Sequence, residues 1–508
     1  MKILLVVPTH KYTQGYPAFL SVSDFPQGYA YISACLKEAG HDVYGLNLNN
    51  ITGFRTAHEL LTNKIHKAIE EYKPDLIGMG GICTDYTFLK DAMQVIRMFS
   101  KAPVVLGGGI VTHDAEFIYN HFKPDYAIKG EAELAMVALA DGKIKEKGII
   151  EAEVPDFDKL PFPDYDTFGI MEMLDKYSMA TRLLYRYSRT NPRPMIISTA
   201  RSCPFNCSFC VHNHGTKYRA RSIDNIMAEI KEMYEKYHFN ILITQDELFA
   251  VNKKRMVEFC QTLIDKKKEY GWDFDWMFQT HANARLDEET LKLAKESGCY
   301  FFSYGLESAS PTVLKSMKKK TQIPEIVETI KMADKVGIGF GGNLIFGDIA
   351  ETPETIGETM KFYYEYGSSE FIFLDIIMPY PGSKLFEFCQ EKGLITDKVN
   401  YYENIERLRY NMTSMPNRLY EEYSHFFRIT EVSWWQTKET WTSKIEVAEP
   451  DVIAKYMKLE NYRLFATCPY CGEETEYVQT LPALKGFMGA GCVHCNKRIK
   501  INIRNGGS

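Results

Sequence analysis

Short apolar runs alternate with helical stretches along most of this chain, and this alternation restricts the fold more than any other feature. Residues 1–150 hold one series, in which "KILLVV", "DVYGLNL", "DLIGMGG" and "PVVLGGG" are separated by stretches with helical spacing. Residues 195–385 hold a second series, from "MIISTA" to "FIFLDII". Strands separated by helices of this length predict parallel sheets covered by helices. The sequence therefore predicts an α/β protein with two units of this kind.

The two series predict different arrangements. The first predicts an open sheet with helices on both faces, whose ligands bind at the carboxyl ends of the strands. The second has six βα units, which predict a partial barrel, (β/α)6, with catalytic residues in the loops after the strands. We expect domains at residues 1–150 and 195–390, joined by a proline- and aspartate-rich linker at 151–194. A helical or irregular segment at 391–465 and a small unit at 466–503 are expected to follow.

Composition and charge exclude several classes of protein. The chain has 508 residues, a net charge of −6 and no apolar run near the ~18 residues that a membrane helix needs. Its first apolar run is too short for a signal peptide, so we expect a cytoplasmic protein without a membrane partner. Because the net charge is negative, a nucleic-acid partner is not expected. Disulfides are not expected in that compartment. Five of the twelve cysteines are interpreted as small core residues, namely Cys35, Cys83, Cys260, Cys299 and Cys389.

Three cysteines crowd the loop that follows the first strand of the second series. Cys203, Cys207 and Cys210 have x3 and x2 spacing within "TARSCPFNCSFCVHN". A cubane iron–sulfur cluster normally takes four thiolates, so three leave one iron open. An open coordination position distinguishes a catalytic metal from a structural one. The triplet therefore predicts a catalytic [4Fe–4S] cluster, with a zinc site completed by His212 or His214 as the alternative.

The other cysteine cluster lies near the end of the sequence. Its pattern is C-x2-C, twenty residues and C-x2-C, formed by Cys468, Cys471, Cys492 and Cys495. Four thiolates with no open position predict a structural zinc ribbon. A rubredoxin-like iron or an auxiliary cluster is the alternative, and either would add a redox function.

The triplet, with Phe209 before its last cysteine, resembles the motif of the radical S-adenosylmethionine (SAM) enzymes. "TQDELF", "SYGLESAS", "GGNLIFGD" and "MPYPGSKL" follow later strands and resemble the branch with the anaerobic magnesium-protoporphyrin ester cyclases and cobalamin-dependent radical methyltransferases. The resemblance implies that SAM chelates the open iron and is cleaved to a 5′-deoxyadenosyl radical. It also implies cofactor contacts at Phe209, Asp246, Glu247, Glu307, Ser308 and Asn343.

Residues 1–150 resemble the Rossmann-like cobalamin-binding domain of the same branch. On physical grounds alone, "GGG" after a strand predicts only a site for a phosphate or a flat ligand. The resemblance implies corrin contacts at Thr84, Gly107, Gly108, Gly109 and Glu131. Pro8 and Thr13 stand where D-x-H-x-x-G proteins have Asp and Gly, so His10 lacks its orienting partner. We therefore expect cobalt without a protein histidine; a domain that has lost cobalamin is the alternative.

The implied reaction is methylation of an unactivated carbon through a 5′-deoxyadenosyl radical and methylcobalamin, under anaerobic conditions. The implied partners are a small-molecule or natural-product substrate and a one-electron donor of the flavodoxin or ferredoxin type. Both cofactors must face the substrate, so we expect one cavity between the two domains. The alternatives are radical cyclisation, oxidation or rearrangement without methyl transfer, and an RNA-modifying or RNA-binding protein that uses the ribbon.

Four arginines precede the second series, namely Arg182, Arg186, Arg189 and Arg193. Guanidinium groups bind carboxylates and phosphates bidentately, so one hypothesis is a clamp for an anionic substrate. The alternative is a solvated helix face.

Overall fold

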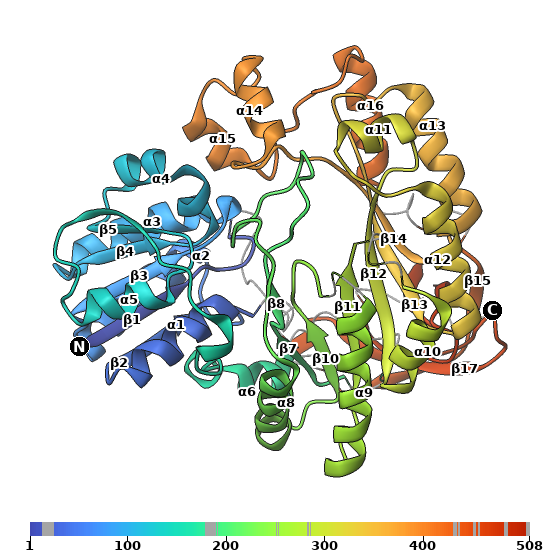
Figure 1. Cartoon of the computed structure of the whole chain (residues 1–508), viewed down its shortest axis with the longest axis horizontal. Coiled ribbons are helices and arrows are strands. Elements are labelled where there is room, and N and C mark those ends of the chain that lie inside the picture. Colours follow the sequence, from blue (N-terminus) through green and yellow to red (C-terminus); the bar gives the residue numbers. More distant parts are fainter. Residues whose placement is uncertain are drawn as a thin grey trace.

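The computed structural model describes residues 1–12, 25–177, 189, 192–249, 251, 253–281, 284, 286–429, 434, 437–450, 454–455, 458–481 and 486–503. Two six-stranded parallel sheets lie side by side, and the cysteine-rich loop runs between them (Figure 1). This arrangement confirms the α/β fold that the alternation predicts. No helix in the described part of the chain combines the length and the apolar character needed to cross a membrane.

The N-terminal sheet has the strand order β2-β1-β3-β4-β5-β6. Its strands are β1 (Lys2–Val7), β2 (Asp42–Asn47), β3 (Leu76–Gly80), β4 (Val104–Gly107), β5 (Tyr126–Lys129) and β6 (Gly148–Glu151). Its helices are α1 (Gln27–Glu38), α2 (Ala57–Tyr72), η2 (Cys83–Asp85), α3 (Tyr86–Phe99), α4 (Gly109–Phe122) and α5 (Glu133–Ala140). The chain direction along the sheet reverses between β1 and β3, and such a point opens a ligand crevice at the carboxyl ends of the strands.

Alternating residues of the buried strands pack on opposite faces of this sheet. Leu5 and Val105 pack with α1 and α5, whereas Leu4, Val6 and Val104 pack with α2, α3 and α4. Both faces are therefore covered, as expected for strands that read as continuous apolar runs.

The second sheet is open, with the order β14-β13-β12-β11-β10-β7. Its strands are β7 (Pro194–Ile197), β10 (Ile241–Thr244), β11 (Asp275–Thr280), β12 (Cys299–Glu307), β13 (Gly339–Phe346) and β14 (Phe371–Ile376). The helices between them are α8 (Ile223–Tyr237), α9 (Lys253–Tyr270), α10 (Glu288–Glu296), α11 (Pro311–Ser316), α12 (Ile323–Val336), α13 (Pro353–Phe362) and η7 (Tyr363–Gly367). Two short strands, β8 (Ala200–Arg201) and β9 (Arg219–Ala220), pair at the base of the cysteine loop. The six parallel strands are those of a partial barrel.

The linker is packed against both large domains. It forms η3 (Phe157–Lys159), η4 (Asp166–Phe168), α6 (Ile170–Glu172) and η5 (Met173–Tyr177). Tyr165 is buried, and its hydroxyl donates to the Ile196 carbonyl of β7 at 2.9 Å. Asp164 accepts from Ser33 of α1 at 2.6 Å. The linker therefore contacts both sheets.

The chain after the barrel differs from the expectation. Helix α16 (Asn417–Arg428) packs on β14 at the upper end of the barrel (Figure 1). Helices α14 (Lys384–Glu391) and α15 (Lys398–Asn404) lie beside it, towards the N-terminal domain, and their buried residues pack with α3. A five-stranded sheet follows, with the order β17-β16-β15-β19-β18. Its strands are β15 (Glu439–Ala448), β16 (Glu460–Thr467), β17 (Glu474–Leu481), β18 (Phe487–Gly491) and β19 (Arg498–Asn502). Strand β15 and most of β16 lie in the segment expected to be helical or irregular, so the C-terminal unit is larger than a bare ribbon.

A buried group of charged side chains joins the two large sheets. Glu131, which follows β5, accepts hydrogen bonds from Arg201 of β8 at 2.5 Å and from Arg219 of β9. Arg201 also donates to Glu133 at 2.7 Å, and its guanidinium lies 4.2 Å from the ring centroid of Phe157. Because β8 and β9 flank the cysteine loop, this charge cluster ties that loop to the N-terminal sheet.

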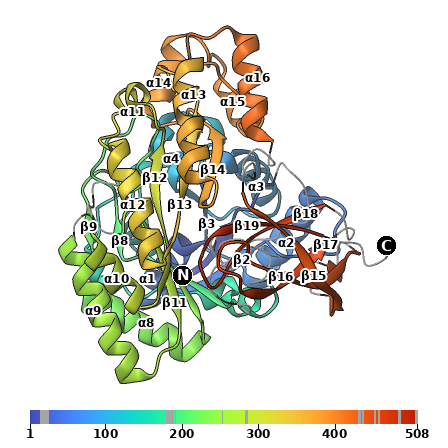
Figure 2. The same cartoon turned by 90° about the vertical axis from the view of Figure 1, so that its right-hand side faces the viewer.

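The C-terminal sheet docks under the barrel, at the amino ends of β13 and β14 (Figure 2). Asn496 donates to the Gly337 carbonyl at 3.1 Å, and Lys497 pairs with the buried Glu370. Arg498 is fully buried and donates to the Ile372 carbonyl at 3.1 Å and to the Tyr363 hydroxyl at 2.7 Å. Three consecutive residues therefore hold this sheet against the end of the barrel opposite the cysteine loop.

Glu131→Gln is expected to lower the free energy of unfolding by about 3–5 kcal/mol at pH 7, because Arg201 and Arg219 lose a buried counter-charge. Burial raises the pKa of Glu131, but hydrogen bonds from the surrounding cations outweigh it and lower the pKa to about 2. The contribution of the carboxylate is complete above its unfolded-chain pKa of about 4.3 and is lost as the pH falls towards 2. Denaturant unfolding at several pH values measures the effect.

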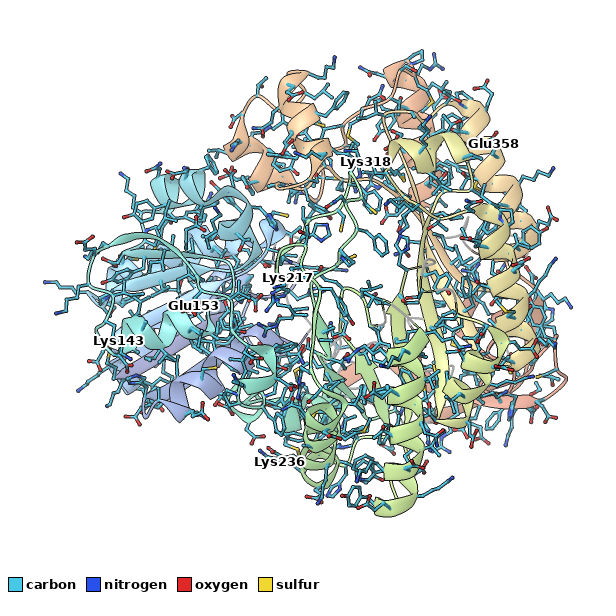
Figure 3. All side chains as sticks on the ribbon, in the orientation of Figure 1. Lys143, Glu153, Lys217, Lys236, Lys318 and Glu358 are labelled. Carbon is cyan, nitrogen blue, oxygen red and sulfur yellow. The ribbon has the colours of Figure 1, made fainter. Side chains whose placement is uncertain are left out.

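Glu153, an exposed carboxylate at the start of the linker (Figure 3), provides the matched control. Glu153→Gln is expected to change the free energy of unfolding by less than about 0.5 kcal/mol. If Glu131→Gln lowers the free energy of unfolding by the same amount from neutral to strongly acidic pH, Glu131 does not act as the buried counter-charge of these arginines.

Arg498→Met is expected to cost about 2 kcal/mol or more, because buried carbonyls at the foot of β14 lose their donor. Amide hydrogen exchange should rise in β13 and β14 but not in the N-terminal sheet. Arg463→Met, on the exposed side of β16, is the control. Exchange that rises equally in both large sheets would show that the docking is not local to the barrel floor.

Candidate active site and metal centres

The three clustered cysteines share a cavity at the carboxyl ends of the barrel strands. The cavity has a volume of about 500 Å³, and Cys203, Cys207, Cys210 and Phe209 all line it. Burial raises the pKa of the Cys210 thiol to about 12 and also raises the pKa of the other two thiols. Thiols bound to a metal are deprotonated, so cationic iron would offset this desolvation. Three sulfur donors converging on one large cavity fit a cubane cluster.

Hydrogen bonds to distant parts of the chain hold the cysteine loop in shape. Ser202 has a left-handed φ of 74°, and its hydroxyl donates to the His214 carbonyl at 2.7 Å, which closes the loop. The Ser208 amide donates to the Met317 carbonyl at 3.0 Å, and the Leu385 amide donates to the Ser208 carbonyl at 3.2 Å. These bonds therefore hold the loop between the end of α11 and the start of α14.

Asp246 lies behind the cavity and does not line it. It is buried and accepts hydrogen bonds from the backbone amides of Thr199 and Ala200 at 2.6 and 3.0 Å. Burial raises the pKa of Asp246 to about 6 despite these bonds. The carboxylate therefore orders the turn that leads into the cysteine loop, and its contact with a cofactor stays a prediction.

Glu247 and Glu307 both line the cysteine cavity. Glu247 lies 3.6 Å from the His212 ring, measured from Oε2 to Nδ1. Glu307 adopts a left-handed φ of 64° and pairs with Lys319 at 2.9 Å. Lys319 follows Lys318, which is labelled at the upper rim of the barrel in Figure 3. The strained backbone at Glu307 turns its carboxylate into the cavity beside a fixed cation.

Asn343 lies within strand β13 and Ser308 directly follows strand β12, but only Asn343 lines the cysteine cavity. Asn343 of β13 lines the cavity and is exposed to it. Ser308 is buried, and its hydroxyl lies 3.0 Å from that of Thr359 in α13. Ser308 is not part of the cavity lining, and its contact with a cofactor stays a prediction.

His281 belongs to the cavity wall but carried no motif that singled it out. It follows β11, and its ring stacks on Phe205 with centroids 4.0 Å apart. Burial, with a smaller effect of Lys319, lowers the pKa of His281 to about 3. The ring is therefore neutral. Its position directly after a barrel strand was the only available signal.

A second cavity, of about 390 Å³, lies at the carboxyl edge of the N-terminal sheet. Gly107, Gly108, Gly109 and Glu131 line it, and it continues under α1 and α5 as far as Gly78 on β3. A Cβ at Gly108 would lie 2.6 Å from the Gly81 carbonyl, and φ there is +83°. The glycines therefore bring bare backbone to the cavity wall, which suits a broad, flat ligand.

Two residues lie outside the lining of the glycine cavity, namely Thr84, which is expected near the corrin, and His10, which is not expected to bind cobalt. Thr84 belongs to a separate small pocket with Tyr402 and Glu403 and does not line the glycine cavity. The His10 amide donates to the Asn49 side chain at 2.7 Å, and His10 is likewise not among the lining residues. Thr13 lies outside the described residues.

The two cavities are adjacent to each other. Asn213, three residues after Cys210, lines both of them. The cysteine cavity and the glycine cavity therefore meet at this side chain, between the two domains. Other side chains occupy the interface, where Lys217 is labelled in Figure 3.

The described arginines before the barrel do not point to either cavity. Arg189 pairs with Asp273 and Asp275 at 2.7 and 2.8 Å, and Arg193 pairs with Asp175 at 2.6 Å. These contacts lie at the amino ends of the barrel strands, opposite the cysteines. The clamp hypothesis is therefore wrong for these two residues; Arg182 and Arg186 lie outside the described part.

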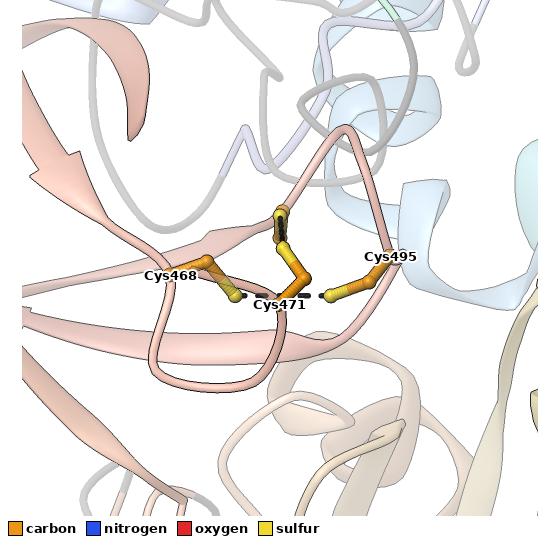
Figure 4. A group of neighbouring side chains, drawn as sticks. Cys468, Cys471 and Cys495 are labelled. Carbon is orange, nitrogen blue, oxygen red and sulfur yellow. Dashed lines mark hydrogen bonds between the residues drawn. The ribbon is translucent and has the colours of Figure 1, made fainter. Parts of the chain in front are cut away.

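Four thiols converge at the C-terminal site (Figure 4). The sulfur atoms of Cys468 and Cys495 are 3.7 Å apart, as are those of Cys471 and Cys492. A tetrahedral zinc with bonds of about 2.3 Å has sulfur–sulfur edges of about 3.8 Å. Gly472, with a φ of +82°, completes the turn after the first pair. The donor set therefore fits zinc; iron of the rubredoxin type would use the same four ligands.

Comparison with known proteins identifies both large domains. The model of the radical SAM superfamily matches residues 197–363, and that of the B12 binding domain matches residues 25–140. An uncharacterized methyltransferase of Pyrococcus horikoshii is 28% identical over 421 residues, which cover 78% of this chain and 84% of the relative. The anaerobic magnesium-protoporphyrin IX monomethyl ester cyclase of Cereibacter sphaeroides is 26% identical, with coverage of 74% and 62%.

A solved structure shares the fold. The radical SAM methyltransferase TsrM of Kitasatospora setae, with tryptophan and a SAM analogue bound, superposes with a TM-score of 0.60 at 17% identity and covers 77% of this chain and 76% of its own. The chain therefore carries a B12 binding domain at residues 25–140, followed by a radical SAM domain at residues 197–363.

Proposed function

We propose that this protein transfers a methyl group from SAM to an unactivated carbon of a small molecule, with a [4Fe–4S] cluster and cobalamin as cofactors. The observation that carries the proposal is the meeting of the cysteine cavity with the glycine cavity at Asn213. The relatives named as methyltransferases support it. A one-electron donor is also required, and we propose a protein of the flavodoxin or ferredoxin type.

Three thiolates would hold the cluster and leave one position open to SAM, namely those of Cys203, Cys207 and Cys210. When bound, the cluster would supply one-electron cleavage of the sulfonium of SAM, and cobalamin would supply a carrier for the methyl group. Asn343, Glu247 and Phe209 line the same cavity and are proposed to contact SAM. Glu307, fixed by Lys319, supplies an acceptor of defined direction.

The glycines that line the second cavity are proposed to support the corrin, which carries amide side chains that backbone groups can bind. Glu131 also lines this cavity, but its carboxylate is already bound by Arg201 and Arg219. We therefore assign Glu131 the role of holding the cavity wall to the barrel. The zinc proposed at the four-cysteine site is structural.

RNA binding by the ribbon is disfavoured by the placement of its basic residues. Arg498 is buried, Lys497 pairs with Glu370 and Lys500 pairs with Glu439. These cations are directed at the protein itself. They would have to leave these partners to bind phosphates.

Purified, reconstituted protein incubated with methyl-labelled SAM, a reductant and a small-molecule extract of the producing cells tests the proposal. Each labelled product should be accompanied by one S-adenosylhomocysteine and one 5′-deoxyadenosine, as mass spectrometry can quantify. If 5′-deoxyadenosine forms with substrate turnover but no labelled product appears, methyl transfer is wrong and cyclisation or rearrangement takes its place.

The triple change of Cys203, Cys207 and Cys210 to Ala is expected to remove about four irons per chain and to abolish 5′-deoxyadenosine. The zinc content should stay at about one per chain. Cys35→Ala, in α1 and outside both cysteine clusters, is the control and should keep its iron. Unchanged iron in the triple variant would overturn the cluster assignment.

A further inference from the structure

Asn213 has a position that neither the cysteine motif nor the glycine motif accounts for. It lines both the cavity of the cysteines and the cavity of the glycines. A ligand in either cavity could therefore contact this side chain. Its chemistry at that point therefore bears on the transfer itself.

The orientation of the Asn213 amide is fixed by a histidine from the other domain. His113 of α4 lies with Nε2 3.0 Å from the Asn213 Oδ1. Burial lowers the pKa of His113, so the ring is neutral at neutral pH and has one N–H. Because Oδ1 only accepts, that N–H is at Nε2. The Nδ2 group of Asn213, with two donor hydrogens, then faces away from His113.

Two glycines make room for this pair of side chains. A Cβ at Gly109, the first residue of α4, would lie 2.6 Å from the Asn213 Oδ1. A Cβ at Gly382, which follows β14, would lie 2.4 Å from the His113 Nδ1. Both gaps are far below a normal contact, so any larger residue at either position would displace the pair. The chain therefore leaves space for this arrangement from two separate elements.

The Nδ2 donors remain available to a ligand. Within the described residues, Asn213 makes no hydrogen bond through Nδ2. Asn213 belongs to the cysteine loop, so it lies on the side of the glycine cavity that faces the barrel. A ligand held in the glycine cavity would therefore meet the Nδ2 donors on the side that faces the barrel.

We propose that Asn213, oriented by His113, is a positioning residue that donates a hydrogen bond from Nδ2 to the ligand on the barrel-facing side of cobalamin. The inference rests on the proposed function, because it requires cobalamin in the glycine cavity. His113 acts only through Asn213. The third glycine of "GGG" then serves to seat Asn213, in addition to lining the cavity.

Added aquacobalamin provides a probe that does not depend on turnover. Its oxygen ligand loses a proton to become hydroxide, and the absorption spectrum follows this titration. A donor to that oxygen stabilises the hydroxide form and lowers the pKa of the bound probe. Asn213→Ala should raise this pKa by about 1 unit, and Asn213→Asp, which also adds negative charge, should raise it further. His113→Ala should give a smaller rise than Asn213→Ala.

Asn206→Ala is the matched control, because Asn206 is an exposed asparagine of the same loop that lines neither cavity. It should leave the pKa of the bound probe unchanged. Iron content and cobalamin stoichiometry establish that each variant is folded. If Asn213→Ala does not fold, Asn213→Asp, which keeps the shape of the side chain, takes its place.

The outcomes separate the inference from the proposed function. Wild-type protein that takes up no cobalamin overturns both. Wild-type protein that binds cobalamin, with the same probe pKa in Asn213→Ala and Asn213→Asp, overturns the role of Asn213 and leaves the proposed function standing. A shift in the Asn213 variants without one in His113→Ala overturns the orienting role of His113.

Discussion

The buried carboxylate of Glu131 is the interaction on which the arrangement of this protein depends. It comes from the N-terminal sheet and binds arginines from both short strands that flank the cysteine loop. In an interior of low dielectric constant, a buried carboxylate is stable only while its cations stay in place. The cysteine loop is therefore held against the N-terminal sheet by a charge pairing, and the linker adds a hydrogen bond from Tyr165 to β7 and the packing of Tyr165 in the core.

Much of the fold follows from period and spacing alone. Both parallel sheets arise from alternating runs whose strands are buried on two faces. The triplet of cysteines lines one cavity, as loops after barrel strands do. Strand β15 was missed because its residues are largely exposed or half-buried, and it becomes a strand only by pairing with β16 on one side and β19 on the other. No local pattern contains that tertiary information.

Individual side chains were harder to predict than motifs, for a geometric reason. A motif places a residue at the end of a strand, but neighbouring residues there point in opposite directions. Glu247 faces the cavity while Asp246 supports the loop from behind. Glu307 and Ser308 divide in the same way. His281 and Asn213 have no motif of their own, and only the folded chain shows that they reach the cavities.

The docking of the C-terminal sheet has a consequence for how the protein matures. The turn that holds Cys492 and Cys495 is followed at once by the residues that neutralise Glu370 and fill the foot of β14. These residues join the chain more than a hundred positions after the strands they support. Until the metal shapes that turn, the barrel keeps an acidic group without its cation and an uncovered apolar edge, which are features that chaperones and proteases recognise. The supply of zinc in the cell would then govern how many molecules survive synthesis, whereas the supply of iron would govern how many of the survivors are active.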